Sequence, residues 1–210
     1  MSALPNLADC GLRGISAIPF GIHMCHFYDK REDLAAALVP YFVAGLNNDE
    51  RCVWVTAEPL NAEAAAGELT RAGLNVQALV KKGSLVIRDY SDFFAGISQL
   101  DGAKSQIMHL WLEEERRALT AGYHGLRITG NTAFVQPGDW SAFMEYEEHA
   151  DSVFATRRII ALCSYPLDRR AGANVLDAVR RHSCTLHGPD EGGWQILAPR
   201  SDIALSDQRL

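Results

Sequence analysis

Two histidines and a cysteine lie in one short, otherwise apolar stretch near the N-terminus, residues 21–28. The stretch is typical of a buried strand, in which a polar side chain costs roughly a few kcal/mol unless it finds a partner. Because side chains alternate along a strand, His23 and Cys25 should point to the same face. Together with His26 they are nitrogen and sulfur donors of the kind that bind zinc or copper. The stretch therefore predicts either a binding site or a set of packed, hydrogen-bonded interior residues.

A metal site at this strand needs further ligands, because the spacing of these three residues is not a standard one for structural zinc. Cys163, Cys184 and His182 could supply them only if the fold brings them close. A nucleophilic cysteine is another possibility, with Cys25 beside a histidine, but the sequence places no third member of a catalytic group. Ligand contact, metal binding and interior packing all stay open at this point.

Composition and charge exclude several classes of protein. The chain has 210 residues, a formal net charge of -6 and no run of basic residues, which argues against a nucleic-acid-binding surface. No apolar run approaches the roughly 18 residues that span a bilayer, and the first twenty residues lack the pattern of a signal peptide. Five cysteines without a CxxC motif favour reduced thiols. We expect a cytoplasmic protein that contacts neither nucleic acid nor membrane.

Strand patterns alternate with helix patterns along most of the chain. Strands are predicted at residues 22–28, 51–56, 85–87, 125–128 and 158–163, with an edge strand at 194–197. Helices are predicted at 29–45, 61–72, 105–121, 139–154 and 173–182, the first capped by Asp29, with a loop at 91–104. The alternation predicts a three-layer α/β fold, in which helices flank a mostly parallel sheet. Residues 1–17 are expected to be a lead-in segment, 18–198 a single domain and 199–210 a loose tail.

In sheets of this kind, ligands bind outside the carboxyl ends of the strands. The residues predicted there are aromatic and amide side chains, one cation and few carboxylates: Tyr28, Asp29, Thr56, Glu58, Asp89, residues 127–131 and residues 163–165. Such a set suits a small, partly apolar ligand with one or two polar groups. The phosphate-binding patterns GxxxxGK[ST] and GxGxxG are absent, and the first strand is followed by Asp29 and Lys30 where a phosphate loop would need glycines. We therefore expect no ATP.

The helix predicted from residue 139 carries a carboxylate on its apolar stripe. That stripe, defined by i,i+3 and i,i+4 spacing, consists of Phe143, Glu147, Ala150 and Phe154. Glu147 either reaches water from the edge of the stripe or faces a pocket, where it would pair with Arg127 or with a histidine of the first strand.

Three aromatic residues are further candidates for ligand contact. Trp54 and Trp140 are of a type that most often packs in a core, with ligand contact as the alternative. Tyr165 stands before Pro166, which marks the exit of a strand.

Several ordered motifs in this chain resemble those of the MEDS family, a sensory domain named after methanogens, methylotrophs and the dichloromethane-dehalogenase regulator. The matching segments are residues 21–28, 38–46, 52–59, 122–131, 140–148 and 161–165. The resemblance covers roughly residues 18–198, nearly the whole chain. It implies a fold similar to RecA and KaiC that has lost the ATP-binding loop, in agreement with the missing phosphate-binding pattern.

The resemblance also implies a function. The family is proposed to sense simple hydrocarbon derivatives in bacterial and archaeal signalling, fused to DNA-binding or histidine-kinase modules. Its contacts in the first strand correspond to His23 and Cys25, and other recurrent motif positions correspond to Arg127, Asn131, Glu147 and Cys163. The expected ligand-binding set is then His23, Cys25, Tyr28, Trp54, Arg127, Asn131, Trp140, Glu147, Cys163 and Tyr165.

The leading prediction is a sensory domain, not an enzyme, that binds a small organic ligand. No output module is apparent in the sequence, so either the signal is expected to pass to a separate regulator or histidine kinase, with a homodimer as a possible arrangement, or the chain is a fragment of a larger regulator, or it has another role. The first alternative is a metal- or cofactor-dependent sensor that uses His23, Cys25 and His26, with a transition metal as the cofactor. The second alternative is a small enzyme that acts through Cys25 or Glu147.

Overall fold

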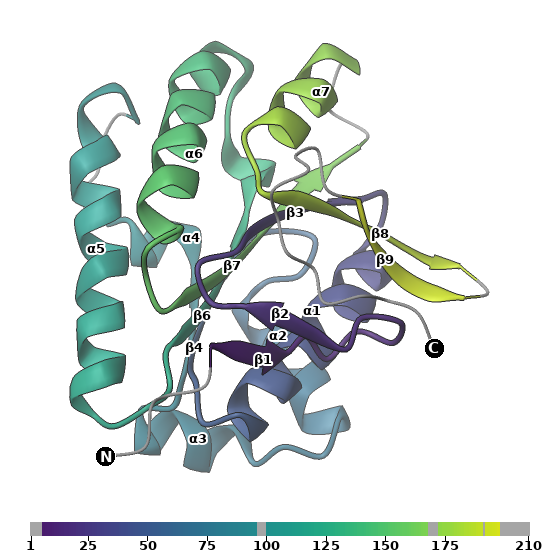
Figure 1. The fold of residues 1–210 in the computed structure, drawn as a ribbon, viewed down its shortest axis with the longest axis vertical. Coiled ribbons are helices and arrows are strands. Elements are labelled where there is room, and N and C mark those ends of the chain that lie inside the picture. The colour runs from purple at the N-terminus through teal and green to yellow at the C-terminus, as the bar shows by residue number, and fades with distance from the viewer. Residues whose placement is uncertain (1–5, 96–99, 168–171, 191, 198–210) are drawn as a thin grey trace.

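A seven-stranded sheet with the order β5-β4-β6-β7-β3-β8-β9 forms the central layer of the computed structural model (Figure 1). The structure describes residues 6–95, 100–167, 172–190 and 192–197. Neighbouring strands are parallel except for β9, which pairs antiparallel with β8. The strands are β3 (His23–Tyr28), β4 (Arg51–Thr56), β5 (Leu85–Asp89), β6 (Leu126–Asn131), β7 (Ile159–Pro166), β8 (Cys184–Asp190) and β9 (Gly193–Leu197). The predicted three-layer α/β class is confirmed.

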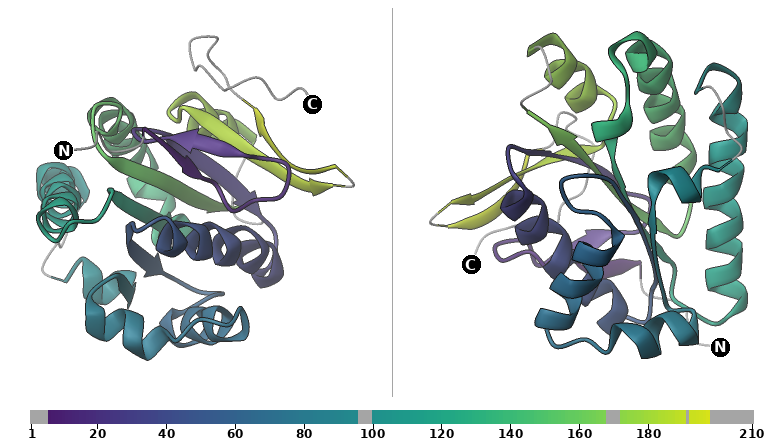
Figure 2. Two further views of the ribbon diagram at one scale, coloured as in Figure 1. Left: turned by 60° about the horizontal axis from the view of Figure 1, so that its bottom comes forward. Right: turned by 180° about the vertical axis from the view of Figure 1, so that it is seen from behind.

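Helices cover both faces of this sheet (Figure 2). One face packs against α1 (Arg31–Asn47), α2 (Ala62–Arg71) and α3 (Val76–Lys82). The other packs against α4 (Tyr90–Phe93), α5 (Leu100–Thr120), α6 (Trp140–Phe154) and α7 (Gly172–Arg180). Two short 3-10 turns, η1 (Thr132–Phe134) and η2 (Pro137–Asp139), connect β6 to α6. Each face therefore has its own apolar cluster, as expected for a parallel sheet buried on both sides.

Side-chain caps define where several helices begin. The side chain of Asn61 accepts a hydrogen bond from the Ala64 N–H at the start of α2, and Asn75 caps α3 in the same way. The start of α1 differs from the sequence prediction, because Lys30 and not Asp29 occupies the N-cap position. The carboxylate of Asp33 instead accepts the backbone N–H groups of Asp29 and Lys30, each at 3.1 Å.

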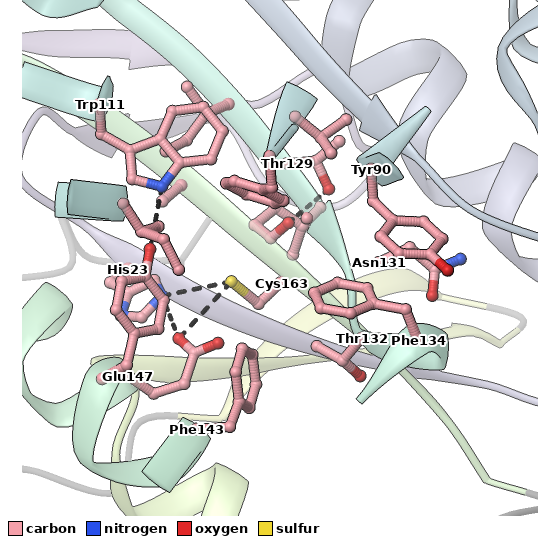
Figure 3. Close-up of a pocket in the computed structure, with 18 of the residues that line it drawn as sticks. His23, Tyr90, Trp111, Thr129, Asn131, Thr132, Phe134, Phe143, Glu147 and Cys163 are labelled. Atoms are coloured by element: carbon pink, nitrogen blue, oxygen red, sulfur yellow. Dashed lines mark hydrogen bonds and ion pairs between the residues drawn. The ribbon is translucent and has the colours of Figure 1, made fainter. Parts of the chain in front are cut away.

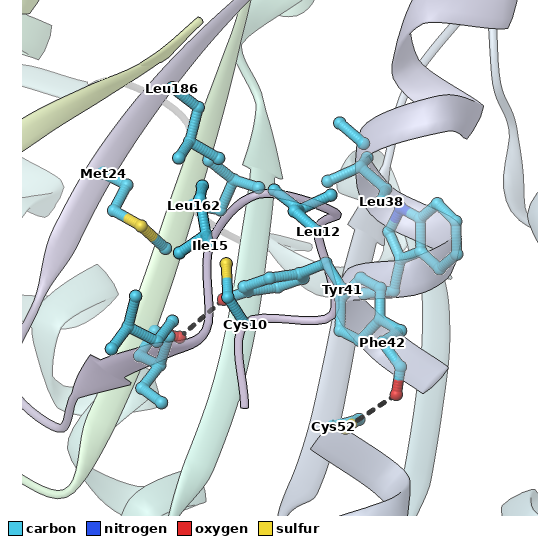
Figure 4. Packing of buried hydrophobic residues seen from close by; sticks show 14 of the residues in the cluster. Cys10, Leu12, Ile15, Met24, Leu38, Tyr41, Phe42, Cys52, Leu162 and Leu186 are labelled. Atoms are coloured by element: carbon cyan, nitrogen blue, oxygen red, sulfur yellow. Dashed lines mark hydrogen bonds between the residues drawn. The ribbon is translucent and has the colours of Figure 1, made fainter. Parts of the chain in front are cut away.

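The predicted lead-in segment contains a small hairpin. β1 (Leu7–Asp9) pairs antiparallel with β2 (Ala17–Pro19) in a separate two-stranded sheet. The side chains of Cys10, Leu12 and Ile15 are buried beside α1 in the same apolar cluster as Tyr41 (Figure 4). This segment therefore contributes to the core, although strands of three residues are too short to give a periodic pattern.

Two further segments differ from the prediction. The expected loop at residues 91–104 holds most of α4 and the first residues of α5, while residues 96–99 lie outside the described ones. β8 was not predicted, and its Pro189 explains why, because proline argues against a strand interior. The predicted tail, residues 199–210, also lies outside the described residues. In the part of the chain that the structure describes, no helix is long and apolar enough to cross a membrane.

Candidate ligand cavity and metal-binding cluster

A cavity of about 430 Å³ lies between the sheet and the helices α4, α5 and α6 (Figure 3). Its floor is formed by β6 and β7, where Gly130 and Cys163 are direct partners in the strand pairing. Both residues are partly exposed, whereas the other residues of these two strands are buried. A Cβ atom built on Gly130 would meet no atom within 4 Å. The absence of a side chain at this position therefore opens the space above the sheet.

Aromatic side chains form most of the cavity wall: Tyr90, Phe94, Trp111, Phe134, Phe143, Tyr146 and Phe154. Tyr90 and Phe134 stack with their ring centroids 4.5 Å apart, and both also line a second hollow at the carboxyl ends of the strands. The indole Nε1–H of Trp111 donates to the hydroxyl of Tyr146 at 2.9 Å. This pair satisfies two polar groups that would otherwise face the cavity, so the wall is chiefly apolar.

Four donor groups converge at one end of the cavity. Nε2 of His23 lies 3.2 Å from Oε2 of Glu147 and 3.4 Å from Sγ of Cys163. The same carboxylate oxygen lies 3.4 Å from Nε2 of His182 and 3.7 Å from the thiol of Cys163. All four donor atoms lie within 4.8 Å of one another. We call these residues the His23–Glu147–Cys163–His182 cluster.

Different elements supply the members of this cluster. His23 is the first residue of β3, Glu147 lies in the middle of α6, Cys163 is in β7, and His182 follows the end of α7. The histidines and the glutamate are at most 1% exposed. Cys163 keeps partial exposure because it faces the cavity across from Gly130. The cluster thus exists only when the sheet and two helices have assembled.

Further contacts orient the two imidazole rings. Nδ1 of His182 lies 2.7 Å from the carbonyl oxygen of Ala178, which can only accept, so this nitrogen carries the proton. Nδ1 of His23 lies 3.6 Å from a carboxylate oxygen of Asp151, which accepts a hydrogen bond from the Ser183 hydroxyl at 2.8 Å. Both rings therefore direct Nε2 toward Glu147.

Burial and neighbouring charges set the protonation of the cluster. Burial opposes the charged form of His23, but Cys163 and the carboxylates of Asp151 and Glu147 outweigh it and raise the pKa of this imidazole well above its ordinary value. Burial and the charge of His23 lower the pKa of His182. Burial opposes ionisation of Glu147, yet the two histidines hold its pKa far below the usual range. Burial raises the pKa of the Cys163 thiol to about 11.

A family model described as the MEthanogen/methylotroph, DcmR Sensory domain, MEDS, matches residues 22–183. The chain belongs to the MEDS family. Among solved structures, a KaiC-like protein from Pyrococcus horikoshii OT3 is similar with a TM-score of 0.61 and 12% identity, over 93% of this chain and 89% of that one. Flagellar accessory protein FlaH from Methanocaldococcus jannaschii gives a TM-score of 0.59 and 13% identity, over 89% and 82% of the two chains. At this identity the likeness concerns the fold alone. A comparison with curated proteins finds no match.

Several residues predicted for the site of this MEDS domain do meet at the cavity. His23, Glu147 and Cys163 line it, and so does Asn131, whose amide oxygen accepts a hydrogen bond from the Tyr28 hydroxyl at 3.0 Å. Of the two partners considered for Glu147, the histidine of the first strand is confirmed by the geometry.

Two predicted aromatic residues stand behind the cluster. Tyr165 places its hydroxyl 3.5 Å from Nε2 of His182, and Trp140 packs edge-on against the Tyr165 ring. They support the cluster, and neither of them is among the residues that line the cavity.

The predicted metal set of His23, Cys25 and His26 does not converge. Cys25 shares the face of His23, as expected, but it is fully buried with its sulfur 3.1 Å from the hydroxyl oxygen of Thr185. His26 points to the opposite face, because it is an odd number of residues from both, and there it packs against Trp194. Its burial lowers the pKa of the imidazole to about 4.

Arg127 and Trp54 also lie on the opposite face of the sheet. Trp54 stacks on Phe42, with ring centroids 4.7 Å apart. Arg127 forms a fully buried ion pair with Glu50, with Nε 2.6 Å from one carboxylate oxygen and Nη2 3.1 Å from the other. Its remaining N–H groups donate to the carbonyl oxygens of Asp9, Cys10 and Tyr41. The predicted pairing of Arg127 with Glu147 is therefore wrong, and this arginine joins β6 to α1 and the N-terminal hairpin.

The strand ends are less important than expected. Thr56 and Asp89 hydrogen-bond each other at 2.6 Å, and neither of them lines the cavity, whereas the next residue, Tyr90, does. At the position of a phosphate loop, a turn of two residues joins β3 to α1, and its N–H groups already bind the carboxylate of Asp33. The N-terminus of α1 therefore carries its own anion.

Sequence reasoning missed important parts of the site. His182 was named only as a distant candidate, since its approach depends on how the α7–β8 connection crosses the sheet. Asp151 could have been found, because it follows Glu147 by four residues on the same face of a predicted helix. Phe134 belongs to a turn with no periodic pattern, so no signal indicated that it would stack on Tyr90.

Proposed function

We propose that this MEDS domain is a sensor that binds one small organic molecule in the cavity between the sheet and α4–α6. The observation that carries the proposal is the cavity itself, which combines aromatic walls with a cluster of polar groups at one end. A volume of about 430 Å³ falls in the range of about 300–1,000 Å³ that is typical of small-molecule sites. The membership of a sensory family agrees with this role.

The chemistry of the lining suggests the class of ligand. Aromatic walls favour an apolar body, and His23, Glu147 and Cys163 offer contacts to a single polar group at its end. A simple hydrocarbon derivative, such as a short alcohol, amine or halocarbon, has this division. A nucleotide has less support, because Asp33 occupies the place where the helix N-terminus would bind phosphate.

A sensor must also change shape or contacts when it binds. A ligand can shift a conformational equilibrium only by the difference in its affinity for the two states. The stacked rings of Tyr90 and Phe134 stand between the cavity and the hollow at the strand ends, so a ligand that reorients them would alter the outer surface of α4 and η1. We propose that a separate regulator or histidine kinase reads this surface.

An enzyme acting through Cys25 has less support. Burial raises the pKa of the Cys25 thiol to about 12, although Thr185 and His23 act in the opposite direction. A thiol that stays protonated and buried is a poor nucleophile.

Thermal denaturation of the purified protein with a panel of short alcohols, amines, thiols and halocarbons tests the proposal. A ligand present at 100 times its Kd stabilises by about 2.7 kcal/mol, which corresponds to a rise in Tm of about 5–11 °C for a chain of this size. The same panel is applied to Gly130→Val, in which the side chain would fill the cavity floor. A binder should raise the Tm of the natural protein by more than that of the variant. Equal shifts in both proteins, or none in the natural one, would contradict ligand binding in this cavity.

A further inference from the structure

The geometry points to a metal site in the His23–Glu147–Cys163–His182 cluster, and we infer that it binds one zinc-class divalent cation. The donor set contains two imidazole nitrogens, one thiol sulfur and one carboxylate oxygen. Cations of borderline softness such as Zn²⁺ take this mixture of ligands in four-coordinate sites. The metal set predicted from the first strand does not supply these four ligands, because only His23 belongs to both the predicted and the observed set.

Four of the six distances between donor atoms lie close to those of a tetrahedral site. Bonds of about 2.0–2.3 Å from zinc to nitrogen, oxygen and sulfur place the ligand atoms about 3.3–3.8 Å from one another. In the cluster, Oε2 of Glu147 lies 3.2 Å from His23, 3.4 Å from His182 and 3.7 Å from Cys163. The separation between His23 and Cys163 is 3.4 Å, and the remaining two are at most 4.8 Å. A cation at the centre needs only small side-chain movements.

The residues around the cluster orient the histidines as ligands. A metal-binding histidine usually directs its second nitrogen to a carbonyl or a carboxylate, which fixes the tautomer. Nδ1 of His182 donates to the Ala178 carbonyl at 2.7 Å, and Nδ1 of His23 faces Asp151 at 3.6 Å. Asp151 is itself held by the Ser183 hydroxyl. Nε2 of His182 therefore directs its lone pair toward the Glu147 carboxylate, 3.4 Å away. Both atoms are hydrogen-bond acceptors, and a cation between them would stabilise this arrangement.

Binding of the metal replaces protons. Zn²⁺ bonds to the sulfur of Cys163 as the thiol proton leaves to solvent, and to Nε2 of His23 as the proton on that nitrogen leaves as well. Nε2 of His182 binds through its lone pair. The carboxylate of Glu147 contributes the second negative charge, so the cation is neutralised inside the protein. No atom changes its oxidation state when the cation binds.

The bound cation would lie at the end of the ligand cavity. Three of the four ligand residues, His23, Glu147 and Cys163, line the cavity, and His182 lies behind them. If the proposed sensor function holds, the metal, by expanding from four to five ligands, offers the polar end of the organic ligand a Lewis acid that accepts an oxygen, nitrogen, sulfur or halogen donor. This last step rests on the proposed function, whereas the metal site stands on the four donor groups alone.

Cobalt titration of the chelator-treated full chain tests the site. Co²⁺ should bind with about one equivalent and give the intense visible bands of a tetrahedral complex, together with a near-ultraviolet charge-transfer band from sulfur to cobalt. Zn²⁺ added afterwards should displace the cobalt and remove both. A weak spectrum typical of six oxygen ligands, or no uptake at all, would overturn the inference.

Matched variants identify the ligands. Cys163→Ser should lose the charge-transfer band, while Cys25→Ser, which alters a buried thiol on the same sheet face, should keep it. His182→Asn retains an N–H for the Ala178 carbonyl and removes the Nε2 ligand, so it should fold and lose the tetrahedral spectrum. Circular dichroism and Tm verify that each variant is folded. A charge-transfer band that survives Cys163→Ser, or disappears in Cys25→Ser, would refute the assignment.

Organic-ligand binding measured on both the metal-free and the metal-loaded protein separates this inference from the proposed function. Metal uptake without any organic ligand leaves the metal site standing and removes the sensor of small organic molecules. If the protein binds an organic ligand but takes up neither cobalt nor zinc, the proposed sensor function stands and the metal site is refuted.

Discussion

Replacing Gly130 by valine should stabilise this protein and weaken its ligand binding at the same time. Gly130 lies in the interior of β6, its φ is not in the left-handed region, and a Cβ atom there meets nothing within 4 Å. Valine is compatible with a strand, and its methyl groups would point over Cys163, the direct pairing partner. They would therefore occupy the part of the cavity next to the polar cluster.

The stabilisation follows from two contributions. A glycine inside a strand costs about 0.5–1 kcal/mol relative to alanine, because it loses more backbone freedom on folding. Each carbon of valine that leaves water adds about 0.8 kcal/mol. Since the new side chain borders a cavity and not a packed core, we expect about 1–3 kcal/mol, which is a rise in Tm of about 2–12 °C.

Urea denaturation and calorimetric titration measure the two effects. The free energy of unfolding should rise in the order glycine, alanine, valine at position 130, while the affinity for the strongest organic binder should fall at least tenfold, about 1.4 kcal/mol, in the valine variant. Gly138→Val is the control, since Gly138 is exposed in η2 and also has open space around it. That change should stay within about 0.5 kcal/mol and leave affinity unaltered.

A loss of stability in Gly130→Val would mean that the space above this residue is filled in solution. Unchanged affinity in a stabilised variant would mean that the ligand binds elsewhere. Either result refutes the link between the missing side chain and ligand binding.

Three further predictions concern other parts of the structure. Arg127→Met should lower the free energy of unfolding by about 3–5 kcal/mol in urea denaturation, because it leaves Glu50 buried without its partner. Adding Glu50→Leu should recover much of this loss, whereas a loss below about 1 kcal/mol in the single variant would contradict the buried pair. Tyr90→Ala removes the stack on Phe134, so organic-ligand affinity should fall about 2–13-fold, as expected for an aromatic pair worth about 0.5–1.5 kcal/mol; unchanged dissociation kinetics would argue against these rings as a barrier. Burial lowers the pKa of His26 to about 4, so on acidification the unfolded chain takes up a proton at a higher pH than the folded one. The free energy of unfolding should therefore fall by up to about 1.4 kcal/mol per pH unit as the pH drops from about 6.5 to 4. His26→Met should flatten this slope, and equal slopes in the natural protein and the variant would refute the prediction.

The sequence was most informative where one element carries its own pattern. The first strand, the shared face of His23 and Cys25, and the position of Glu147 on an apolar helix face all follow from side-chain periodicity. The replacement of the phosphate loop by a short turn is likewise visible in the residues that follow the first strand.

The rest depends on contacts between distant segments. Periodicity cannot tell which face of a parallel sheet packs against which helices, because strands buried on both sides are apolar throughout. Arg127 was therefore considered beside a first-strand histidine as one of two partners for Glu147, although it binds Glu50 on the other face. His182 enters the cluster through a connection between α7 and β8, and β8 itself was not predicted. Gly130 gave no signal, because the sequence does not show that nothing packs above it.

The cavity floor has a consequence for how relatives could differ in what they recognise. Many α/β proteins place specificity in the loops at the carboxyl ends of the strands, where insertions are tolerated. Here the proposed ligand cavity lies above the strands themselves, so its depth is set by alternate residues of β6 and β7, such as Ile128, Gly130, Ala161 and Cys163. A single methyl gained or lost at one of these positions would resize the cavity with no change of backbone. Members of the family with identical loops could therefore respond to different molecules.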